Sequence, residues 1–232
     1  MLFPKNISGG YPGAWGPELL AAITHEYLLK WKFAVSLDFS HAFDTINVKM
    51  VQEALLCILP SGCHAWITLL TEHWMNLRRW FCFDGHIHQN ALTMEVGIPQ
   101  GDPASPLIMT ILLRVGYGLV EESLKDHCFQ AIYMDDRAVV TDSWEKVLLA
   151  QQTWANFAEK IHMIENHTKA QLVDVEGNNG KSWCDHLGVC IGKPSADDFR
   201  TFPKNVKRLE EAKRVALRAG ILPLGTSGKC KQ

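Results

Sequence analysis

Hydrophobic and polar residues alternate in some parts of this chain and recur at helical spacing in others. Alternation over residues 33–37 predicts a strand, and apolar residues at intervals of three and four predict a helix that follows residue 44. Apolar runs on both sides of a polar turn at 133–136 predict a strand, a tight turn and a second strand. A long apolar helix is predicted over 107–124, and an amphipathic helix over 142–161.

Start signals accompany these three helices. Asp44 is expected to begin the first, and Ser105 to cap the second with Pro106 in its first turn. Asp142 with Glu145 forms a capping pattern at the start of the third. The caps therefore predict where each helix begins.

The remaining elements are more weakly marked. Helical patterns are found at 18–29, 66–77 and 205–219. Strand-like runs are found at 79–83, 170–175 and 186–191. Residues 1–16 are rich in glycine and proline and predict a loop. Strands and helices follow one another irregularly, which favours an α+β fold with an antiparallel sheet backed by helices.

Composition limits the class of protein. The chain has 232 residues, 47% of them hydrophobic, enough for one large domain. Arg114 interrupts the longest apolar run, so no membrane span is predicted, and no secretory signal is seen at the N-terminus. Seven cysteines without a Cys-x-x-Cys pair suit reduced thiols in an intracellular protein of the nucleus or cytoplasm. Cys184, His186 and Cys190 form a partial zinc pattern, for which structural packing is the favoured interpretation.

Charge is unevenly distributed along the chain. The net charge is −2, but from Arg200 onwards nine basic residues face two acidic ones, which gives +7 there and −9 for the rest. The helix predicted at 205–219 either follows a phosphate backbone or is a solvated amphipathic helix; the pattern allows both.

Three polar segments carry the candidate chemistry. Asp38 follows the strand at 33–37, a loop rich in glycine and proline spans 97–106, and Asp135 and Asp136 lie in the tight turn. Adjacent carboxylates about 4 Å apart repel by roughly 4 kcal/mol at an effective dielectric constant near 20. A divalent cation would neutralise such a pair.

The order of these segments resembles the reverse transcriptase palm. L-D-x-x-x-A-F-D from Leu37, G-I-P-Q-G-x-P-x-S-P-L from Gly97 and Y-M-D-D from Tyr133 are similar to motifs A, B and C of that family. The resemblance covers residues 9–192. The Ala-Phe-Asp ending of the first motif is most similar to non-LTR retrotransposon and group II intron enzymes, whereas Met134 is less typical of them, so the subfamily stays open.

The resemblance implies a catalytic metal site. Asp38, Asp135 and Asp136 are the implied ligands of two Mg²⁺ ions, for which Mn²⁺ can substitute. Asp38 and Asp135 would bind directly, and Asp136 would support them. Two such ions clamp the attacking and leaving oxygens when a dNTP is transferred to a primer 3'-hydroxyl.

The same resemblance implies residues that bind the substrate. They are Phe39, Phe43, Gln100, Gly101 and Tyr133. Phe43, five residues after Asp38, would exclude a 2'-hydroxyl by steric clash; the alternative is a buried core phenylalanine. Lys169, in a segment that resembles motif D, would act as a catalytic cation near the leaving pyrophosphate.

Three parts of the chain are expected. Residues 33–192 would form the palm, 1–32 a remnant of the fingers or a connector, and 193–232 a basic helix and tail at the start of a thumb. Fingers and thumb would thus be truncated, with other domains or chains supplying them. The expected partners are an RNA or DNA template with its primer and dNTPs, and no membrane.

Two alternatives to an RNA-directed DNA polymerase remain. One is a catalytically inactive palm remnant that at most binds nucleic acid. The other is an RNA-dependent RNA polymerase palm, because Asp38 and Asp44 also have the spacing of that family's paired aspartates. Phe43 and the Pro-Gln-Gly loop argue against the second.

Overall fold

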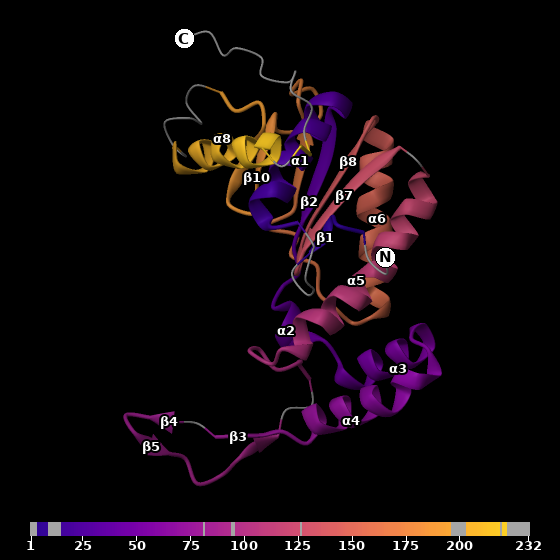
Figure 1. The fold of residues 1–232 in the computed structure, drawn as a ribbon, viewed down its shortest axis with the longest axis vertical. Coiled ribbons are helices and arrows are strands. Elements are labelled where there is room, and N and C mark those ends of the chain that lie inside the picture. The colour runs from indigo at the N-terminus through magenta and orange to yellow at the C-terminus, as the bar shows by residue number, and fades with distance from the viewer. Residues whose placement is uncertain are drawn as a thin grey trace.

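A five-stranded sheet forms the centre of the protein (Figure 1). The computed structural model describes residues 4–8, 15–80, 82–93, 96–125, 127–195, 203–218 and 220–221. The strand order is β1-β7-β8-β2-β9, in which β1 is parallel to β7 and every other pair is antiparallel. The strands are β1 (Ile7–Ser8), β2 (Phe33–Leu37), β7 (Cys128–Tyr133), β8 (Asp136–Thr141) and β9 (Gln171–Asp174). The predicted α+β fold with an antiparallel sheet and helices is confirmed.

Helices cover both faces of this sheet (Figure 1). The helices α5 (Ala104–Leu124) and α6 (Trp144–Lys160) lie on one face, and α1 (Pro17–Trp31) on the other. Because successive side chains of a strand point to opposite faces, Val35 packs in the core of α5 and α6, whereas Ala34 packs towards α1. The hairpin of β10 (Trp183–His186) and β11 (Val189–Gly192) and the helix α8 (Pro203–Arg218) pack against α1.

A second group of elements extends from one end of the sheet (Figure 1). Its helices are α2 (Ala42–Thr45), α3 (Val48–Ile58), the 3₁₀ turn η1 (Ser61–Cys63) and α4 (His64–Met75). A thin arm follows, built from β3 (Arg78–Arg79), β4 (Cys82–Phe83), β5 (His86–Ile87) and β6 (Leu92–Thr93). β3 pairs with β6 and β4 with β5, so the predicted strand at 79–83 is two short strands, and a turn follows at Asp84 and Gly85.

Two helix starts differ from their predictions. Asp44 does not begin the helix that follows it, because it lies inside the short α2. The cap of α3 is Asn47, whose side chain accepts hydrogen bonds from the backbone N–H groups of residues 49 and 50. Ser105 is not a cap, since α5 already begins at Ala104 and the Ser105 hydroxyl donates to the carbonyl of Pro99 at 2.7 Å. Several polar residues near each start could cap, and packing selects among them.

The start of α6 is a third correction. Ser143, not Asp142, caps this helix by accepting a hydrogen bond from the backbone N–H of Lys146. Asp142 instead pairs with the side-chain ammonium of Lys146 at 2.6 Å and with His127. The carboxylate therefore acts as an ion-pair partner beside the helix start.

The predicted strand at 186–191 is right for residues 189–191 but is not continuous. The segment holds a turn at Leu187 and Gly188, both with positive φ, which separates β10 from β11. In that hairpin Cys190 is opposite Asp185, while His186 is opposite Val189, so Cys190 and His186 point to different faces and their positions suit packing rather than a shared zinc ion.

No helix within the described ranges is long and apolar enough to cross a membrane. The predicted loop at 1–16 and the predicted tail after 220 lie largely outside the described residues, which at the N-terminal end include the strand β1.

Candidate active site

The three candidate carboxylates come from two adjacent strands and the turn beside them. Asp38 directly follows β2, Asp136 is the first residue of β8, and Asp135 lies in the turn before it. The antiparallel register pairs Leu37 with Arg137, so the next step along both strands brings Asp38 beside Asp136. Strand pairing therefore places side chains about 100 residues apart in sequence at one edge of the sheet.

The electrostatics show that these charges are incompletely neutralised. Burial, together with the negative charges of Asp135 and Asp38, raises the pKa of Asp136 from 3.8 to about 6. Burial also raises the pKa of Asp135, and the charge of Asp38 contributes in the same direction. The site therefore favours a bound cation or a proton.

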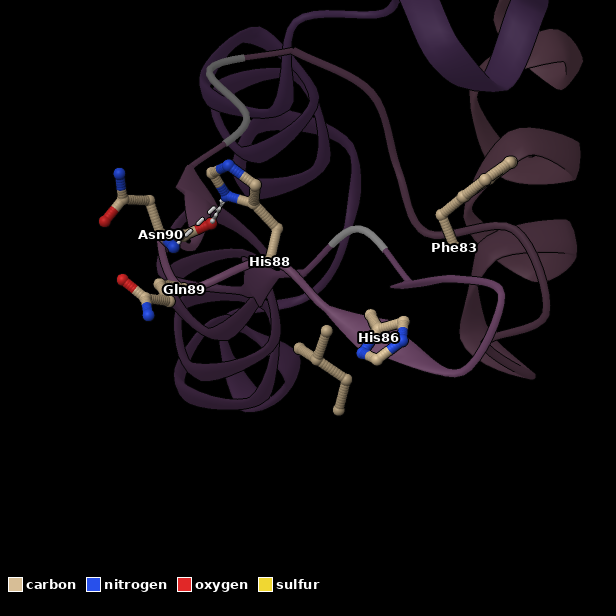
Figure 2. A pocket seen from close by; sticks show the side chains of 6 residues that line it. Phe83, His86, His88, Gln89 and Asn90 are labelled. Carbon is tan, nitrogen blue, oxygen red and sulfur yellow. Dashed lines mark hydrogen bonds between the residues drawn. The ribbon is translucent and has the colours of Figure 1, made fainter.

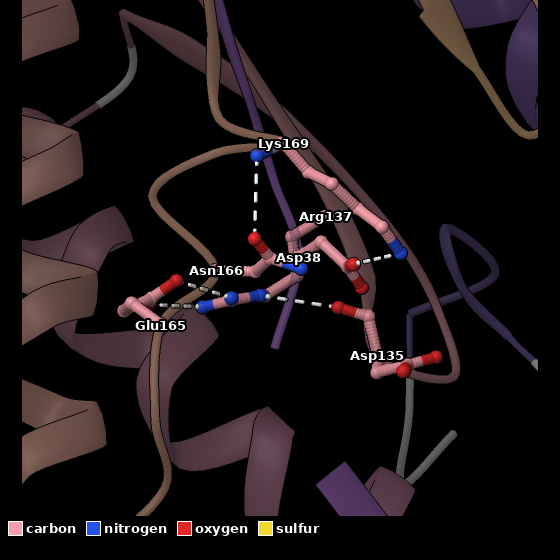
Figure 3. A network of polar contacts seen from close by, with 6 residues as sticks. All are labelled: Asp38, Asp135, Arg137, Glu165, Asn166 and Lys169. Carbon is pink, nitrogen blue, oxygen red and sulfur yellow. Dashed lines mark hydrogen bonds and ion pairs between the residues drawn. The ribbon is translucent and has the colours of Figure 1, made fainter. Parts of the chain in front are cut away.

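Lys169 supplies one positive charge to this cluster. Its Nζ lies 2.7 Å from Oδ2 of Asp38, and the hydrogen bond and charge of Asp38 raise the pKa of Lys169. Figure 3 shows the lysine side chain extending to that carboxylate. The lysine side chain is 68% exposed, so it can leave Asp38 without breaking the core.

A divalent cation such as Mg²⁺ needs several oxygen donors close together. In the part of the chain that the structure describes, no three His, Cys, Asp or Glu side chains are grouped as a ready metal site. Yet Asp38, Asp135 and Asp136 offer the oxygen donors that hard divalent ions prefer. The raised pKa values of Asp135 and Asp136 indicate that added positive charge would stabilise their ionised forms. The chemistry of these residues thus fits such an ion, with Lys169 as its competitor for Asp38.

A pocket of about 420 Å³ lies next to Asp135, which lines it, whereas Asp38 and Asp136 are not among its lining residues. Its lining includes Phe43, Gln100, Gly101 and Asp135, which come from three separate segments of the chain. Four predicted site residues therefore meet in one cavity, of a size that suits a small ligand.

Hydrogen bonds join the loop that follows Gly97 to the end of the Asp38 segment. The backbone N–H of Ile98 donates to the carbonyl of Phe43 at 2.7 Å, and that of Gly97 to Ile46 at 2.8 Å. The Gln100 side-chain amide donates to the Asp44 carboxylate at 2.9 Å. These bonds fix the pocket wall and hold the backbone of Phe43 in place.

Two predicted substrate residues lie elsewhere. Phe39 is only 2% exposed, and its ring packs under the guanidinium of Arg137 in the core that α6 covers. Tyr133 is half-buried at the end of β7 and packs against the cluster formed by Leu20 and its neighbours. Neither side chain lines the pocket.

Arg137 was not expected from the motifs. Its side chain is fully buried, donates two hydrogen bonds to Glu165 and donates a third from Nε to the backbone carbonyl of Asp135 at 3.3 Å (Figure 3). Burial lowers the pKa of Arg137, and Glu165 opposes that shift. A charge inside an otherwise apolar strand was the feature of the sequence that could have identified it.

A larger hollow of about 530 Å³ lies on the arm (Figure 2). It is lined by Phe83 and by residues 86–90, and none of these is acidic. It therefore lacks the carboxylates of the smaller pocket, and the candidate site is assigned to the latter.

Fold and site together define a polymerase-type palm, in which a sheet edge carries the acidic residues. The family model for reverse transcriptase (RNA-dependent DNA polymerase) matches residues 5–191. The chain therefore belongs to the reverse transcriptase family. A search of curated protein sequences gives no match.

Solved telomerase structures share the fold. Apo telomerase from Candida tropicalis, truncated from its C-terminal domain, aligns with a TM-score of 0.59 at 14% identity, over 73% of this chain and 36% of that chain. Telomerase from Candida albicans in complex with a TWJ fragment of telomeric RNA aligns with a TM-score of 0.59 at 13% identity, over 94% of this chain and 43% of that chain. The chain spans less than half the length of these two telomerase chains.

Proposed function

We propose that this chain is the palm of an RNA-directed DNA polymerase from a retroelement of the non-LTR or group II intron type. It adds deoxynucleotides to the 3'-hydroxyl of a primer on an RNA or DNA template. The observation that carries the proposal is the meeting of Asp38, Asp135 and Asp136 beside a pocket lined by Phe43 and Gln100. The Ala-Phe-Asp ending at residues 42–44 supports the subtype.

Asp38, Asp135 and Asp136 would hold two Mg²⁺ ions, or Mn²⁺ in their place. When bound, these ions activate the primer hydroxyl and stabilise the leaving oxygen in an in-line displacement. Lys169 leaves Asp38 and turns its exposed ammonium towards the pyrophosphate, where it neutralises developing charge or donates a proton.

The pocket selects the sugar. Phe43 lies in its wall together with Asp135, so a nucleotide with its phosphates at the carboxylates would place its ribose near the ring. A ring without a hydrogen-bonding group cannot satisfy a 2'-hydroxyl and excludes it by size. Gln100, oriented by Asp44, and Gly101 also line the pocket, and the base and the template would contact the backbone there.

Residues 33–192 would form the palm, 1–32 the part that leads into it from the fingers, and 193–232 the beginning of a thumb. The helix α8 packs against α1. This contact supports treating residues 1–32 and 193–232 as one layer on the palm. Lys213 pairs with Glu26 across this contact at 3.2 Å. Further domains or chains would complete the grip on the template and primer.

Primer extension tests the proposal. The purified chain is given an RNA template, a DNA primer, Mg²⁺ or Mn²⁺, and labelled dNTPs or rNTPs. Two variants accompany it: Asp135→Asn removes a carboxylate of the site, and Asp84→Asn removes one from the turn of the arm, where asparagine also accepts the positive φ of 47°.

Extension with dNTPs that Asp135→Asn loses and Asp84→Asn keeps is the expected result. Incorporation of rNTPs alone would instead identify an RNA-dependent RNA polymerase. A folded wild-type chain that shows no incorporation dependent on a divalent ion would refute polymerase activity of this chain by itself, and would leave a palm that at most binds nucleic acid.

A further inference from the structure

Arg137 occupies an unusual place for a charged residue. It follows Asp136 in β8, and its side chain has no exposed surface. The guanidinium carbon lies 3.5 Å from the centre of the Phe39 ring and 4.8 Å from that of Trp154. Charged side chains are almost never fully buried unless they are paired, so its partners decide its role.

Arg137 is hydrogen-bonded to two separate segments of the chain at the candidate site. Its Nη1 and Nη2 donate to the two carboxylate oxygens of Glu165 at 2.9 and 2.8 Å, a bidentate pair. Its Nε donates to the backbone carbonyl of Asp135 at 3.3 Å. One planar side chain therefore contacts both the main chain of a candidate metal ligand and a residue 28 positions further along the chain.

Glu165 belongs to the segment that carries Lys169. This segment is bonded to the Asp38 strand, because the N–H of Ser40 donates to Ile164 at 2.8 Å and the N–H of Asn166 donates to Asp38 at 2.9 Å. The N–H of Lys169 in turn donates to the Asn166 carbonyl at 3.1 Å (Figure 3). The Arg137–Glu165 pair thus joins the Asp135 turn to the segment that flanks Asp38.

Stability alone is a weak explanation for this pair. Removing two charges from water costs as much as their attraction returns, and well-packed apolar residues of similar volume often do as well or better. Such residues would pack among apolar side chains that are already present, those of Leu37, Phe39 and Trp154. The geometry of the bonds to Asp135 and Glu165, rather than their energy, is what apolar residues could not reproduce.

We propose that Arg137 is a positioning residue that fixes the backbone of Asp135 and, through Glu165, holds the 164–169 segment against Asp38. The proposal rests on the proposed function of the carboxylate site. In this arrangement the backbones of Asp38, Asp135 and Lys169 keep their relative places when substrate enters, while the Lys169 side chain stays free to turn. Lysine cannot replace arginine, because it lacks the planar fork that binds Glu165 and Asp135 at once.

The test uses a variant that keeps the core filled. Arg137→Met combined with Glu165→Leu removes both members of the ion pair, so that neither charge is left buried alone, and it also removes the Nε donor of the Asp135 carbonyl. Lys213→Met combined with Glu26→Leu is the matched control, since it removes an ion pair between α8 and α1. Arg137→Lys is the third variant and keeps the charge. Three quantities are measured on each: the melting temperature, the Mn²⁺ affinity from the electron paramagnetic resonance of free Mn²⁺, and single-turnover primer extension with the primer–template Kd.

We expect the Arg137/Glu165 variant to melt near the wild-type temperature and to bind Mn²⁺ about 10–100-fold more weakly, the usual effect of losing a residue that orients metal ligands. The extension rate should fall by a similar factor, with an unchanged primer–template Kd. Arg137→Lys should show the same losses, and the Lys213/Glu26 control neither.

Wild-type Mn²⁺ affinity in a folded Arg137/Glu165 variant would overturn the proposal; if that variant does not fold, wild-type affinity in Arg137→Lys would do so. The Mn²⁺ measurement also separates the two proposals. A wild-type chain that binds Mn²⁺ and extends no primer refutes the polymerase function, while the comparison of affinities still decides the role of Arg137.

Discussion

Gly97 lies directly against the backbone of Phe43 and Asp44, which leaves little room for a side chain. Its φ is +92°, and a Cβ added there would lie 3.0 Å from the carbonyl oxygen of Asp44 and 3.2 Å from that of Phe43. Gly101, four residues later, has almost the same φ of +94° but no neighbour within 4 Å of such a Cβ. The two glycines therefore separate backbone strain from steric contact.

The magnitudes follow from this difference. A left-handed backbone costs a residue with a side chain about 1–2 kcal/mol, which applies to both Gly97→Ala and Gly101→Ala. Only Gly97→Ala also forces a methyl group against backbone, and overpacking of this kind costs about 1–3 kcal/mol more. The carbonyl of Phe43 cannot yield easily, because it accepts the 2.7 Å hydrogen bond from Ile98.

Urea unfolding, followed by circular dichroism, measures the difference in unfolding free energy between Gly97→Ala and Gly101→Ala. With a slope of about 1–3 kcal/mol per molar urea, the extra 2 kcal/mol or so should lower the midpoint of Gly97→Ala by about 1 M relative to Gly101→Ala. Equal midpoints for the two variants would refute the reasoning, since they would show that the contact with Phe43 and Asp44 costs nothing.

Three further predictions concern the carboxylates and the pocket. Phe43→Ala should raise ribonucleotide incorporation relative to deoxynucleotide incorporation by roughly 10–200-fold, measured as the ratio of kcat/KM values, because the ring no longer meets the 2'-hydroxyl. Lys169→Met should slow incorporation about 100-fold and leave primer–template binding intact, because the charge near the leaving group is lost. Metal-free protein should lose about 1–2 kcal/mol of unfolding free energy between pH 5 and pH 7.5, measured by urea unfolding, and Asp136→Asn should lose less.

The sign of the pH effect comes from the raised pKa. Folded Asp136 holds its proton up to about pH 6, whereas the unfolded chain releases it near 3.8, so the folded state is favoured at low pH and loses that advantage as the pH rises through about 6. A two-unit shift corresponds to about 3 kcal/mol, which partial exposure reduces to the value above. A pH profile of Asp136→Asn parallel to that of the wild type would contradict this assignment.

The other two predictions have simple controls. For Lys169→Met, the surface variant Lys49→Met should keep the wild-type rate, and an unchanged rate in Lys169→Met itself would remove the lysine from the chemistry. For Phe43→Ala, unchanged discrimination between the two sugars would assign the ring to the core alone.

The sequence was informative where one segment determines its own structure. Alternation at 33–37 and the apolar runs on both sides of the turn at 133–136 were sufficient for β2, β7 and β8, because these strands are largely buried. Phe43, Gln100 and Asp135, which come from the three motifs, line one pocket. Their roles in catalysis stay predictions.

Contacts between distant segments could not be read in this way. β1 is two residues long and pairs with Ile132 and Tyr133, so nothing in residues 7–8 alone marks a strand. The partner of Arg137 lies 28 positions away in an irregular segment. Both Asp44 and Asn47 could cap the helix α3 from their sequence positions. Asn47 is the cap because Asp44 lies inside α2.

The strand order also sets the sequence of events during synthesis. β2 is made early, but its neighbours in the sheet, β8 and β9, follow it by about 100 residues or more. At about 5–20 residues per second, the ribosome needs roughly 5–20 s to reach β8. During that interval Phe33–Leu37 is an apolar strand without its partners, and fragments that end before β8 should aggregate for the same reason. The acidic edge of the sheet therefore comes into existence late, only when the second half of the chain has emerged.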